Sequence, residues 1–546
     1  MRDLSTESML TVKQLLNQAV LDSLDKLGLK NTPLKIEIEY PPQENYGDYT
    51  TNAAIQAAKM LNKPPLETAG LIAGYLRNQR GLKPVFSKIE TAGPGFINFY
   101  LNPDYLIRAV GEILKKKDKW GQSKIGQGQK VQLEFISANP TGPLTIGNGR
   151  GGFFGDALGN VMKKCGFKVT KEYLINDAGK QIESLGHSVL KDGEAVYKGD
   201  YIDELHQLFQ NRQDAYQVGQ AAAKIILDKI IRQTVEEKMK VSFDVYFSEE
   251  KELRKTRKIA KVIKWLKKKN YLYEKDGAWW FKSAELGDIR DRVLVKSNGE
   301  STYLAQDFAY LVSKFKERKF KQVINIWGAD HYGDVAGLLN AAKVLGYEGK
   351  QIVILMQFVR LLADGKEVRM SKRKGTYITM DELIDEVGHD VARFMFLMYA
   401  PSTHINFDLN LAKERSEKNP VYYVQYAHAR IASILRQKEL DNFKGAEPAG
   451  ESALNDPAKL DEHEIRLIKE CLKWPEILEE VSGSFQVQEL PSYAIKLADR
   501  FHQFYTHCRV IDNGQVNPFR VKEVGLAKEA LSQVLGTIGV SAPEKM

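Results

Sequence analysis

"VQLEFISANPTGPLTIGNGRGGFFGDALGN", residues 131–160, combines three features that together decide the fold. The apolar run at 131–136 predicts a buried strand, and the small and apolar residues from 151 onwards predict a helix. Between them lies a turn, PTGPLTIGNGRGG at 140–152, that is rich in glycine and proline. A strand, a glycine-rich turn and a helix in this order are typical of nucleotide-binding units in α/β proteins.

The turn allows more than one interpretation. Gly147, Gly149 and Gly152 match the GxGxxG pattern, and Glu172 follows about twenty residues later, as in a dinucleotide fingerprint. In that fingerprint the first glycine comes directly after the strand, whereas residues 137–146 separate the apolar run from Gly147 here. The second interpretation places a phosphate at the start of the following helix, where backbone amides and the helix dipole attract anions. A tight turn without a ligand is the third.

The second interpretation is chemically the more complete. Thr145 and Asn148 supply side-chain donors, and Gly147 and Gly149 let a base or a phosphate approach the backbone. A distant loop, KEVRMSKRKGTYIT at 366–379, contains lysines that can reach a triphosphate as mobile charges. The two segments together indicate an ATP site.

The segments around this unit predict an α/β domain over residues 131–410. Strand-like runs alternate with helical patterns, which is typical of a Rossmann-like parallel sheet covered by helices. Helical patterns at about 185–270 interrupt the alternation and predict a helical insertion, whose lysines form either a solvated face or an RNA contact. The strand-like runs are VQLEFI (131–136), FKVTKEYLI (167–175), QVINIWG (322–328) and QIVILMQ (351–357).

Two further domains are expected beside the α/β domain. Residues 1–115 combine amphipathic helices with strand patterns at 34–40 and 92–101, which predicts a separate α+β domain. Residues 116–130, rich in Gly, Gln and Lys, are interpreted as a linker. Residues 411–546 lack strand patterns and predict an all-α helical bundle. Its four amphipathic stretches are 419–437, 460–481, 491–511 and 521–539.

The composition is that of a globular protein with a basic balance. The formal charge of +9 and the pI near 9.0 suit a polyanionic partner such as RNA. No apolar stretch is long enough to span a membrane and the first residues lack a signal-peptide core, so a cytoplasmic location is expected. Cys165, Cys471 and Cys508 form no CxxC pair, so neither a disulfide nor a structural zinc site is expected.

Two short motifs resemble the signatures of class I aminoacyl-tRNA synthetases. TIGN at 145–148 is similar to the HIGH motif, and RMSKR at 369–373 is similar to the KMSKS motif. Longer segments resemble bacterial arginyl-tRNA synthetases in order and spacing, and the resemblance extends over nearly the whole chain. These segments are EFISANPTGPL (134–144), YLINDAGKQI (173–182), FDVYFSEE (243–250), STYLAQDFAY (301–310), WGADHYGD (327–334) and NPVYYVQYAHARI (419–431).

This resemblance implies an ATP-dependent ligase. Such an enzyme converts L-arginine and ATP to arginyl-adenylate and pyrophosphate, then transfers the arginyl group to the 3′ end of tRNA(Arg) and releases AMP. The implied partners are tRNA(Arg), L-arginine and ATP, with Mg²⁺ accompanying the ATP and no structural zinc, and the implied state is a monomer. The domain at 1–115 is expected to contact the tRNA, and the helical domain at 411–546 is expected to bind the anticodon.

The resemblance also implies roles for individual residues. The expected catalytic residues are Thr145, Asn148 and Lys372, and the expected ATP contacts are these three with Gly147, Gly149, Met370 and Ser371. The HIGH-like region comprises Ala138, Asn139, Pro140, Thr141, Gly142, Pro143, Leu144, Thr145, Ile146, Gly147 and Asn148. The expected arginine site comprises Glu134, Asn139, Glu249, Tyr303, Asp307, Asp330 and His331. Tyr426 and Arg430 are expected to contact tRNA.

Both signatures depart from the family pattern: the HIGH motif usually has histidine where this chain has Thr145 and Asn148, and Arg369 replaces the first lysine of the KMSKS motif. Adenylation requires charge stabilisation and positioning and moves no proton, so a hydroxyl and an amide can replace two histidines as hydrogen-bond donors. We therefore expect an active enzyme. The alternatives are a catalytically impaired, synthetase-derived tRNA-binding protein and a class I synthetase for another amino acid.

Overall fold

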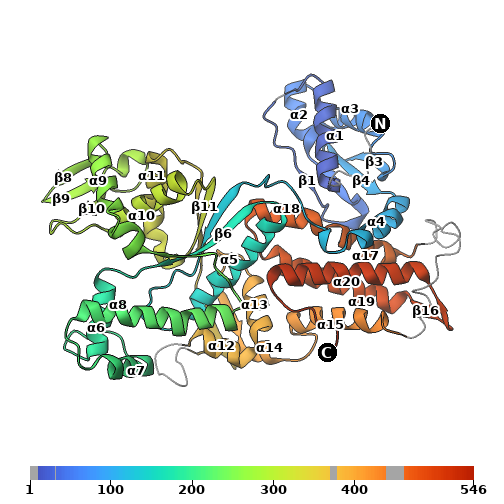
Figure 1. The fold of residues 1–546 in the computed structure, drawn as a ribbon. Helices are drawn as coiled ribbons and strands as arrows, with labels where there is room; N and C mark the ends of the chain where they lie inside the picture. The colour runs from blue at the N-terminus through green and yellow to red at the C-terminus, as the bar shows by residue number, and fades with distance from the viewer. Residues whose placement is uncertain (1–9, 31, 369–377, 438–459) are drawn as a thin grey trace.

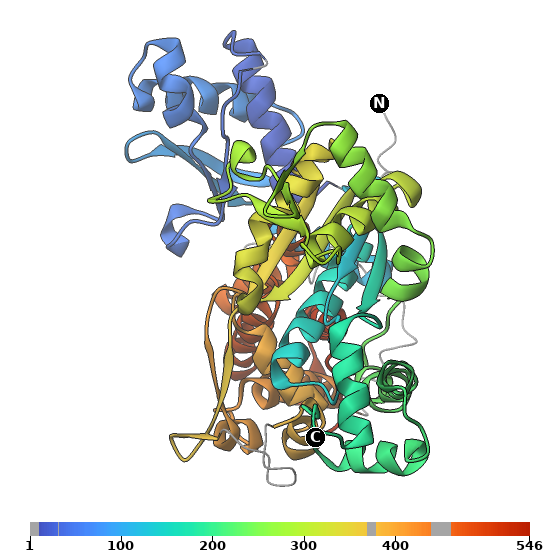
Figure 2. The ribbon, with the colours of Figure 1, turned by 90° about the vertical axis from the view of Figure 1, so that its left-hand side faces the viewer.

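The computed structural model describes residues 10–30, 32–368, 378–437 and 460–546. Figure 1 shows a central α/β region, with the amino-terminal domain and a group of long helices on the same side of it. The view from the side in Figure 2 places the amino-terminal domain at one end of the molecule, above the long carboxyl-terminal helices. The three expected regions are therefore present.

The amino-terminal domain contains a four-stranded antiparallel sheet in the order β1-β2-β4-β3. Helix α1 begins at Val12 because the hydroxyl of Thr11 and the side chain of Gln14 each accept a hydrogen bond from the other's backbone amide. The strand patterns predicted β1 and β4 and missed the other two strands. The elements are α1 (Val12–Lys26), β1 (Ile38–Glu39), β2 (Tyr49–Thr51), α2 (Ala53–Leu61), α3 (Pro65–Asn78), β3 (Phe86–Ala92), β4 (Phe96–Leu101) and α4 (Pro103–Lys116).

The main sheet has the expected Rossmann-like architecture. Its five strands lie in the order β12-β11-β5-β6-β7 and are all parallel. The chain runs from the central strand β5 to one side and later returns to the other side, so a crevice opens at the carboxyl end of β5. The strands are β5 (Lys130–Glu134), β6 (Lys168–Ile175), β7 (Val245–Ser248), β11 (Gln322–Gly328) and β12 (Gln351–Met356), with α5 (Ile146–Lys164) and α11 (Tyr332–Val344) beside them.

Two insertions interrupt this sheet, where one was expected at about 185–270. The first consists of helices, and the chain then returns to the sheet as β7, which pairs with β6. A strand of four residues is too short to show a period, which is why the sequence did not predict it. The second insertion carries an antiparallel sheet in the order β10-β9-β8. The elements are α6 (Lys180–Leu190), α7 (Asp200–Phe209), α8 (Ala215–Ile226), α9 (Lys258–Lys268), β8 (Leu272–Lys275), β9 (Ala278–Phe281), β10 (Arg292–Val295) and α10 (Tyr303–Leu311).

The segment 116–130, interpreted as a linker, is packed against its neighbours. Trp120 is buried, and a Cβ atom at Gly121 would meet the ring of Trp474. A Cβ atom at Gly126 would lie 2.6 Å from the ring of Phe167. The glycines of this segment therefore permit close approach to other elements, which composition alone does not distinguish from flexibility.

The carboxyl-terminal region is helical, as expected, with one helix more than the sequence predicted among its described residues. The stretch 460–481 forms two helices because Pro475 lies in the first turn of the second, where it cannot donate a backbone hydrogen bond to the first. The helices are α15 (Pro420–Ile434), α17 (Glu462–Leu472), α18 (Trp474–Ser484), α19 (Glu489–His507) and α20 (Pro518–Ile538), and a hairpin of β16 (Ile511–Asp512) and β17 (Gln515–Val516) precedes α20.

A small sheet and three helices connect the α/β region to the carboxyl-terminal helices. The sheet has the order β14-β13-β15, and its central strand pairs with β15 in parallel. The elements are β13 (Val359–Ala363), β14 (Lys366–Val368), α12 (Met380–Val387), α13 (His389–Leu397), β15 (Ile405–Asp408) and α14 (Leu409–Lys413).

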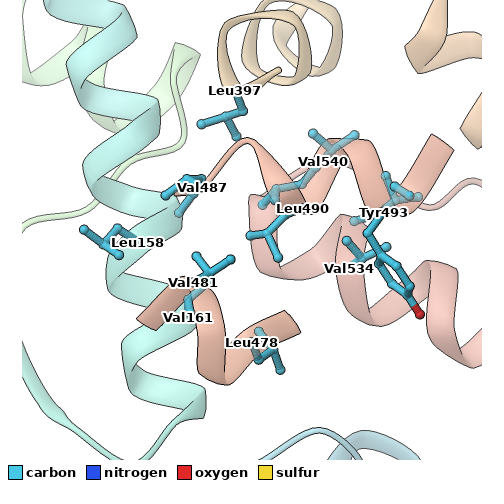
Figure 3. Packing of buried hydrophobic residues seen from close by; sticks show 14 of the residues in the cluster. Leu158, Val161, Leu397, Leu478, Val481, Val487, Leu490, Tyr493, Val534 and Val540 are labelled. Atoms are coloured by element: carbon cyan, nitrogen blue, oxygen red, sulfur yellow. The ribbon is translucent and has the colours of Figure 1, made fainter. Parts of the chain in front are cut away.

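Helix α5 joins the sheet to the carboxyl-terminal helices. Figure 3 shows Leu158 and Val161 of α5 beside Leu478 and Val481 of α18, and all four side chains are fully buried. Each such leucine or valine contributes about 1.5–3 kcal/mol through burial. Helix α5, which begins within the HIGH-like region at Ile146, is therefore part of the core between the main sheet and the carboxyl-terminal helices.

A buried ionic network strengthens the same connection. Asp156 of α5 accepts a hydrogen bond from Lys171 of β6 at 2.6 Å and pairs with Arg393 of α13. The Arg393 guanidinium also donates to the carbonyl of Ile538 at the end of α20. Three elements therefore meet at the Asp156 carboxylate, and Arg393 links them to a fourth, α20.

Across the described residues, no helix has the length and apolar character needed to cross a membrane. Cys165, Cys471 and Cys508 are buried and form no disulfide.

Candidate active site

A cleft of about 1140 Å³ opens at the carboxyl ends of the central strands. Its floor follows β5, β6, β11 and β12, and its walls come from the HIGH-like turn, from α10 and from the segments 196–201, 327–338 and 356–359. This is where open parallel sheets bind ligands.

The chain leaves β5 in a strained conformation that shapes the cleft. Ile136 (φ 63°) and Ser137 (φ 41°) both have left-handed backbone, which is unfavourable for a β-branched residue such as isoleucine. The loop is held by its neighbours: the hydroxyl of Tyr173 donates to the carbonyl of Ala138 at 2.7 Å, and that of Tyr201 donates to the carbonyl of Thr141 at 2.9 Å.

Most of the HIGH-like region faces the cleft. Pro140 and Leu144 are buried behind the wall. The residues of this region that line the cleft are Ala138, Asn139, Thr141, Gly142, Pro143, Thr145, Ile146, Gly147 and Asn148.

Thr145 and Asn148 form a reciprocal cap at the start of α5. The backbone amide and the hydroxyl of Thr145 both donate to Asn148 Oδ1, at 3.0 and 2.8 Å, and the Thr145 hydroxyl accepts from the Asn148 amide at 3.3 Å. Asn148 Nδ2 has no hydrogen-bond partner within the described part of the chain. The expected pair of donors is therefore reduced to one, because the threonine hydroxyl proton is used by the asparagine.

The two glycines of the turn differ in their surroundings. At Gly147 the atom nearest to an added Cβ would be the Thr145 hydroxyl, at 3.7 Å, so its backbone is open to a ligand. Gly149 does not line the cleft, and a Cβ there would overlap the sulfur of Met380. The expectation that Gly149 lets a ligand approach is thus corrected: its lack of a side chain serves the packing of α5 against α12.

Replacing Gly149 by alanine will therefore destabilise the fold by about 1–3 kcal/mol, the usual cost of overpacking a core. Chemical denaturation measures the change, and Gly147→Ala, which has space for its methyl group, is the matched control and will leave the free energy of unfolding nearly unchanged or slightly higher. Equal stabilities of the two variants would contradict this assignment.

The second signature, RMSKR at 369–373, lies outside the described residues. Met370, Ser371 and Lys372 fall within 369–377, so their positions stay a prediction. The segment that follows is described: Thr379 bridges to Thr145, and the amide of Met380 donates to the carbonyl of Leu144 at 2.9 Å. The end of the KMSKS-like loop is thus joined to the HIGH-like turn.

The dinucleotide interpretation is wrong, because it requires Glu172 to bind a ribose. Glu172 is fully buried within β6 and accepts hydrogen bonds from Arg318, from Tyr310 and from Gln132, the last at 2.7 Å. Its carboxylate is therefore not available to a ribose.

Helix α10 brings two predicted arginine-site residues into the cleft. Tyr303 and Asp307 are four residues apart, so they lie on one helix face, and both line the cleft. The Asp307 carboxylate has no hydrogen bond or ion pair with any described residue. Burial, reinforced by the nearby Glu134, raises the pKa of Asp307 to about 7. An acid that is poorly solvated and unpaired is suited to a cationic ligand.

The other predicted arginine-site residues differ in their availability. Glu134 lines the cleft, but its Oε2 accepts from Lys314 Nζ at 2.6 Å. Asn139 lines the cleft and accepts a hydrogen bond from Asn176 Nδ2 at 2.9 Å. Asp330 and His331 lie at the rim, more than half exposed, with 3.7 Å between the carboxylate and the ring.

Glu249 does not reach the cleft in this conformation. It lies directly after β7, is buried, and accepts from Arg254 Nε at 2.6 Å. The expected guanidinium partner of Glu249 is thus replaced by an arginine of the chain itself. The sequence could not indicate this pairing, because it arises from the irregular helical turn Glu250–Arg254 that follows.

Several residues that the sequence did not single out also line the cleft. Asn176 directly follows β6, and a polar residue at the carboxyl end of a parallel strand is the signal that could have identified it. Lys314 and Arg292 also line the cleft, and each is paired with an acid. Phe358 lines the cleft as well and stacks on His404, with 6.3 Å between the ring centroids. No group of three or more metal-ligating side chains occurs in the described ranges.

The predicted tRNA contacts lie far along the chain, on α15. Tyr426 is 36% exposed and stacks on Tyr422, and the guanidinium of Arg430 lies 5.0 Å from the Tyr426 ring and 4.8 Å from that of Tyr505 on α19. Stacked rings with a neighbouring arginine form a surface that suits nucleobases.

A parallel sheet in this order, a HIGH-like turn after its central strand and a second loop joined to that turn define a class I aminoacyl-tRNA synthetase. Family models agree: residues 206–396 match "tRNA synthetases class I (R), catalytic domain", residues 13–101 match "Arginyl tRNA synthetase N terminal domain", and residues 424–546 match "DALR anticodon binding domain".

Whole-length relatives make the assignment more specific. The chain is 42% identical over 544 residues to an arginine–tRNA ligase of Moorella thermoacetica and 41% identical over 535 residues to one of Carboxydothermus hydrogenoformans, covering 93% and 94% of both chains. Arginyl-tRNA synthetase of Thermus thermophilus shares the fold with a TM-score of 0.76 at 21% identity, covering 98% of this chain and 100% of the other. The chain belongs to the arginyl-tRNA synthetase family.

Proposed function

We propose that the chain is an arginine–tRNA ligase. The observation that carries this proposal is Asp307, whose carboxylate lies in the same cleft as the HIGH-like turn and has no partner among the residues that the structure describes. A planar guanidinium binds a carboxylate through two parallel hydrogen bonds, which the single ammonium of lysine cannot form. Tyr303 flanks this carboxylate, and Asn139 lies where it can hold the other end of the amino acid.

In the first step, an oxygen of the arginine carboxylate attacks the α-phosphorus of ATP, and the bond to the pyrophosphate oxygen breaks. No proton is transferred, so the chain must position the reactants and stabilise charge. Asn148 Nδ2 donates to a phosphate oxygen, and Lys372, with Met370 and Ser371 beside it, approaches the leaving phosphates from the loop joined to the turn. Mg²⁺ bound to the substrate ATP would offset further phosphate charge.

In the second step, a hydroxyl of the terminal ribose of tRNA(Arg) attacks the carbonyl carbon of arginyl-adenylate. The bond to the phosphate oxygen breaks, AMP leaves, and the hydroxyl proton passes to the departing phosphate. The amino-terminal domain contacts the body of the tRNA, and the α15 surface with Tyr426 and Arg430 contacts anticodon-arm bases. The enzyme acts as a cytoplasmic monomer.

Arginine affinity will fall about tenfold as the pH is lowered from 8 to 6. The pKa of Asp307 is raised to about 7, and the guanidinium pairs with the carboxylate form, which predominates only above that pH. Equilibrium binding of arginine in a pH series measures the effect.

Two variants control this pH series. Asp307→Asn will have weak and nearly pH-independent affinity, and His331→Asn, at the rim, will retain the pH dependence of the parent. A parent affinity that is constant between pH 6 and 8 would contradict the assignment.

Pyrophosphate exchange with ATP tests the amino-acid choice. Exchange in the presence of tRNA(Arg) should depend on arginine, and neither lysine nor cysteine should replace it. The alternative, an impaired tRNA-binding protein, predicts tRNA binding without exchange. The alternative is less favoured, because an unpaired arginine-site carboxylate beside the ATP turn is of no use to a protein that only binds tRNA.

A further inference from the structure

The first insertion contributes a wall of the cleft that has no assigned role. Val196, Tyr197, Lys198 and Gly199, between α6 and α7, all line the cleft. The segment is held in place: the hydroxyl of Ser188 accepts from the amides of Val196 and Tyr197 at 2.9 Å each. Two residues after the wall ends at Gly199, the hydroxyl of Tyr201 donates to the carbonyl of Thr141 in the HIGH-like region. The wall is therefore a built part of the site.

Lys198 is the cation of this wall. Among the described lining residues, Arg292 is paired with Asp288, Lys314 is paired with Glu134, and His331 lies between two aspartates. Lys198 is exposed, and no described acid lies within ion-pair distance of it. Tyr197 beside it is half-buried and also lines the cleft. A free cation next to an aromatic ring suits a single-stranded nucleic acid.

The position of this wall separates it from the other two substrates. Along the chain, β13, β14 and the KMSKS-like loop follow β12, and the segment after that loop is joined to the HIGH-like turn, so the triphosphate is expected on the β12 side of this turn. Arginine is expected at the centre, between Asp307 and Asn139. The wall at 196–199 follows β6, on the opposite side of β5 from β12, and lines the same cleft. This is the side left for the third substrate, whose ribose must reach the arginyl carbonyl.

We propose that Tyr197 and Lys198 bind the single-stranded 3′ end of the tRNA. Lys198 contacts a backbone phosphate close to the terminal ribose, and the ring of Tyr197 stacks on a neighbouring base. This inference rests on the proposed function and specifies how the second half-reaction receives its RNA.

Equilibrium binding without ATP or arginine tests the proposal. The probes are tRNA(Arg) and the same tRNA lacking its last three nucleotides. Lys198→Ala will bind the intact tRNA about fivefold more weakly, with the slope of log affinity against log salt reduced by about 0.7, as for one lost phosphate contact on a single strand. Its affinity for the shortened tRNA will remain that of the parent, and Lys198→Arg will retain both affinities.

Lys191→Ala is the matched control. Lys191 belongs to the same insertion and is exposed, but it pairs with Asp203 at 2.7 Å and does not line the cleft, so neither affinity will change. Tyr197→Leu, which removes the aromatic face, will also weaken binding of the intact tRNA and will leave binding of the shortened tRNA unchanged.

Three results would overturn the proposal. In the first, Lys198→Ala binds the intact tRNA as tightly as the parent does, and in the second it binds both RNAs equally more weakly. In the third, Lys198→Ala raises the KM for ATP and leaves the ratio of the affinities for the intact and the shortened tRNA unchanged. The last result would assign Lys198 to the triphosphate. Failure of the proposed function is recognised separately, because the parent protein would then attach arginine to no tRNA(Arg).

Discussion

Asp307→Asn will lower kcat/KM for arginine by about 10²- to 10³-fold, the loss expected when a desolvated guanidinium is deprived of its carboxylate. The asparagine amide occupies the same space but carries no charge and offers one acceptor in place of two. The loss should appear mainly as a raised KM for arginine, with a much smaller change in the KM for ATP. Arginine-dependent pyrophosphate exchange in the presence of tRNA measures both constants.

This loss will not be caused by unfolding. The pKa of Asp307 is raised to about 7, above the ordinary value of about 4, so ionisation is less favourable in the folded state than in the unfolded chain. At pH 8 the ionised carboxylate therefore lowers the free energy of unfolding, and asparagine removes that cost. The variant should be as stable as its parent or more stable. A kcat/KM for arginine within fivefold of the parent would place guanidinium selection elsewhere.

Asn148→Asp will lower the rate of arginine activation by about tenfold to a hundredfold, the scale of one lost donor in a transition state. An aspartate can still accept the hydrogen bonds of the Thr145 amide and hydroxyl, so the cap at the start of α5 remains. Only the Nδ2 donor is removed, and a negative charge replaces it near the phosphates. Activation rate and thermal stability are measured on the same samples.

Three further variants separate the cap from the donor. Asn148→Ala loses both, so it will be slower and less stable, by about 1 kcal/mol. Thr145→Ala frees the asparagine to rotate and will raise the KM for ATP, whereas Thr145→Ser, which retains the hydroxyl, will restore it. A parental rate in Asn148→Asp would mean that the turn acts through its backbone alone.

The regular parts of the fold could be predicted from the sequence because their periods are long enough to detect. Four strand-like runs correspond to β5, β6, β11 and β12, and they form a parallel sheet as expected. What escaped prediction is short or set by tertiary contacts. Strand β7 has four residues, and the segment 116–130 reads as a linker although Trp120 is buried within it.

The candidate site follows the same division. The family resemblance implied Asp307 and Tyr303 as arginine-site residues, and both line the cleft from one face of α10. The pairing of Glu249 with Arg254 depends on the irregular helical turn Glu250–Arg254, and the pairing of Glu134 with Lys314 depends on how separate elements meet, so neither could be predicted. Gly149 matches a ligand-binding pattern, but its surroundings are Met380 and the helix core. A glycine motif does not distinguish space left for a ligand from space left for a side chain.

Arginylation of tRNA(Arg) tests the central claim most directly, namely that this cleft joins arginine to tRNA although both usual histidines are replaced. The protein, ATP, Mg²⁺, radiolabelled arginine and tRNA(Arg) are combined, and acid-precipitable label is followed over time. The predicted result is many turnovers per enzyme, with AMP formed in proportion to arginyl-tRNA, and almost none in Asp307→Asn. A folded protein that binds tRNA(Arg) but forms no arginyl-tRNA would contradict the account.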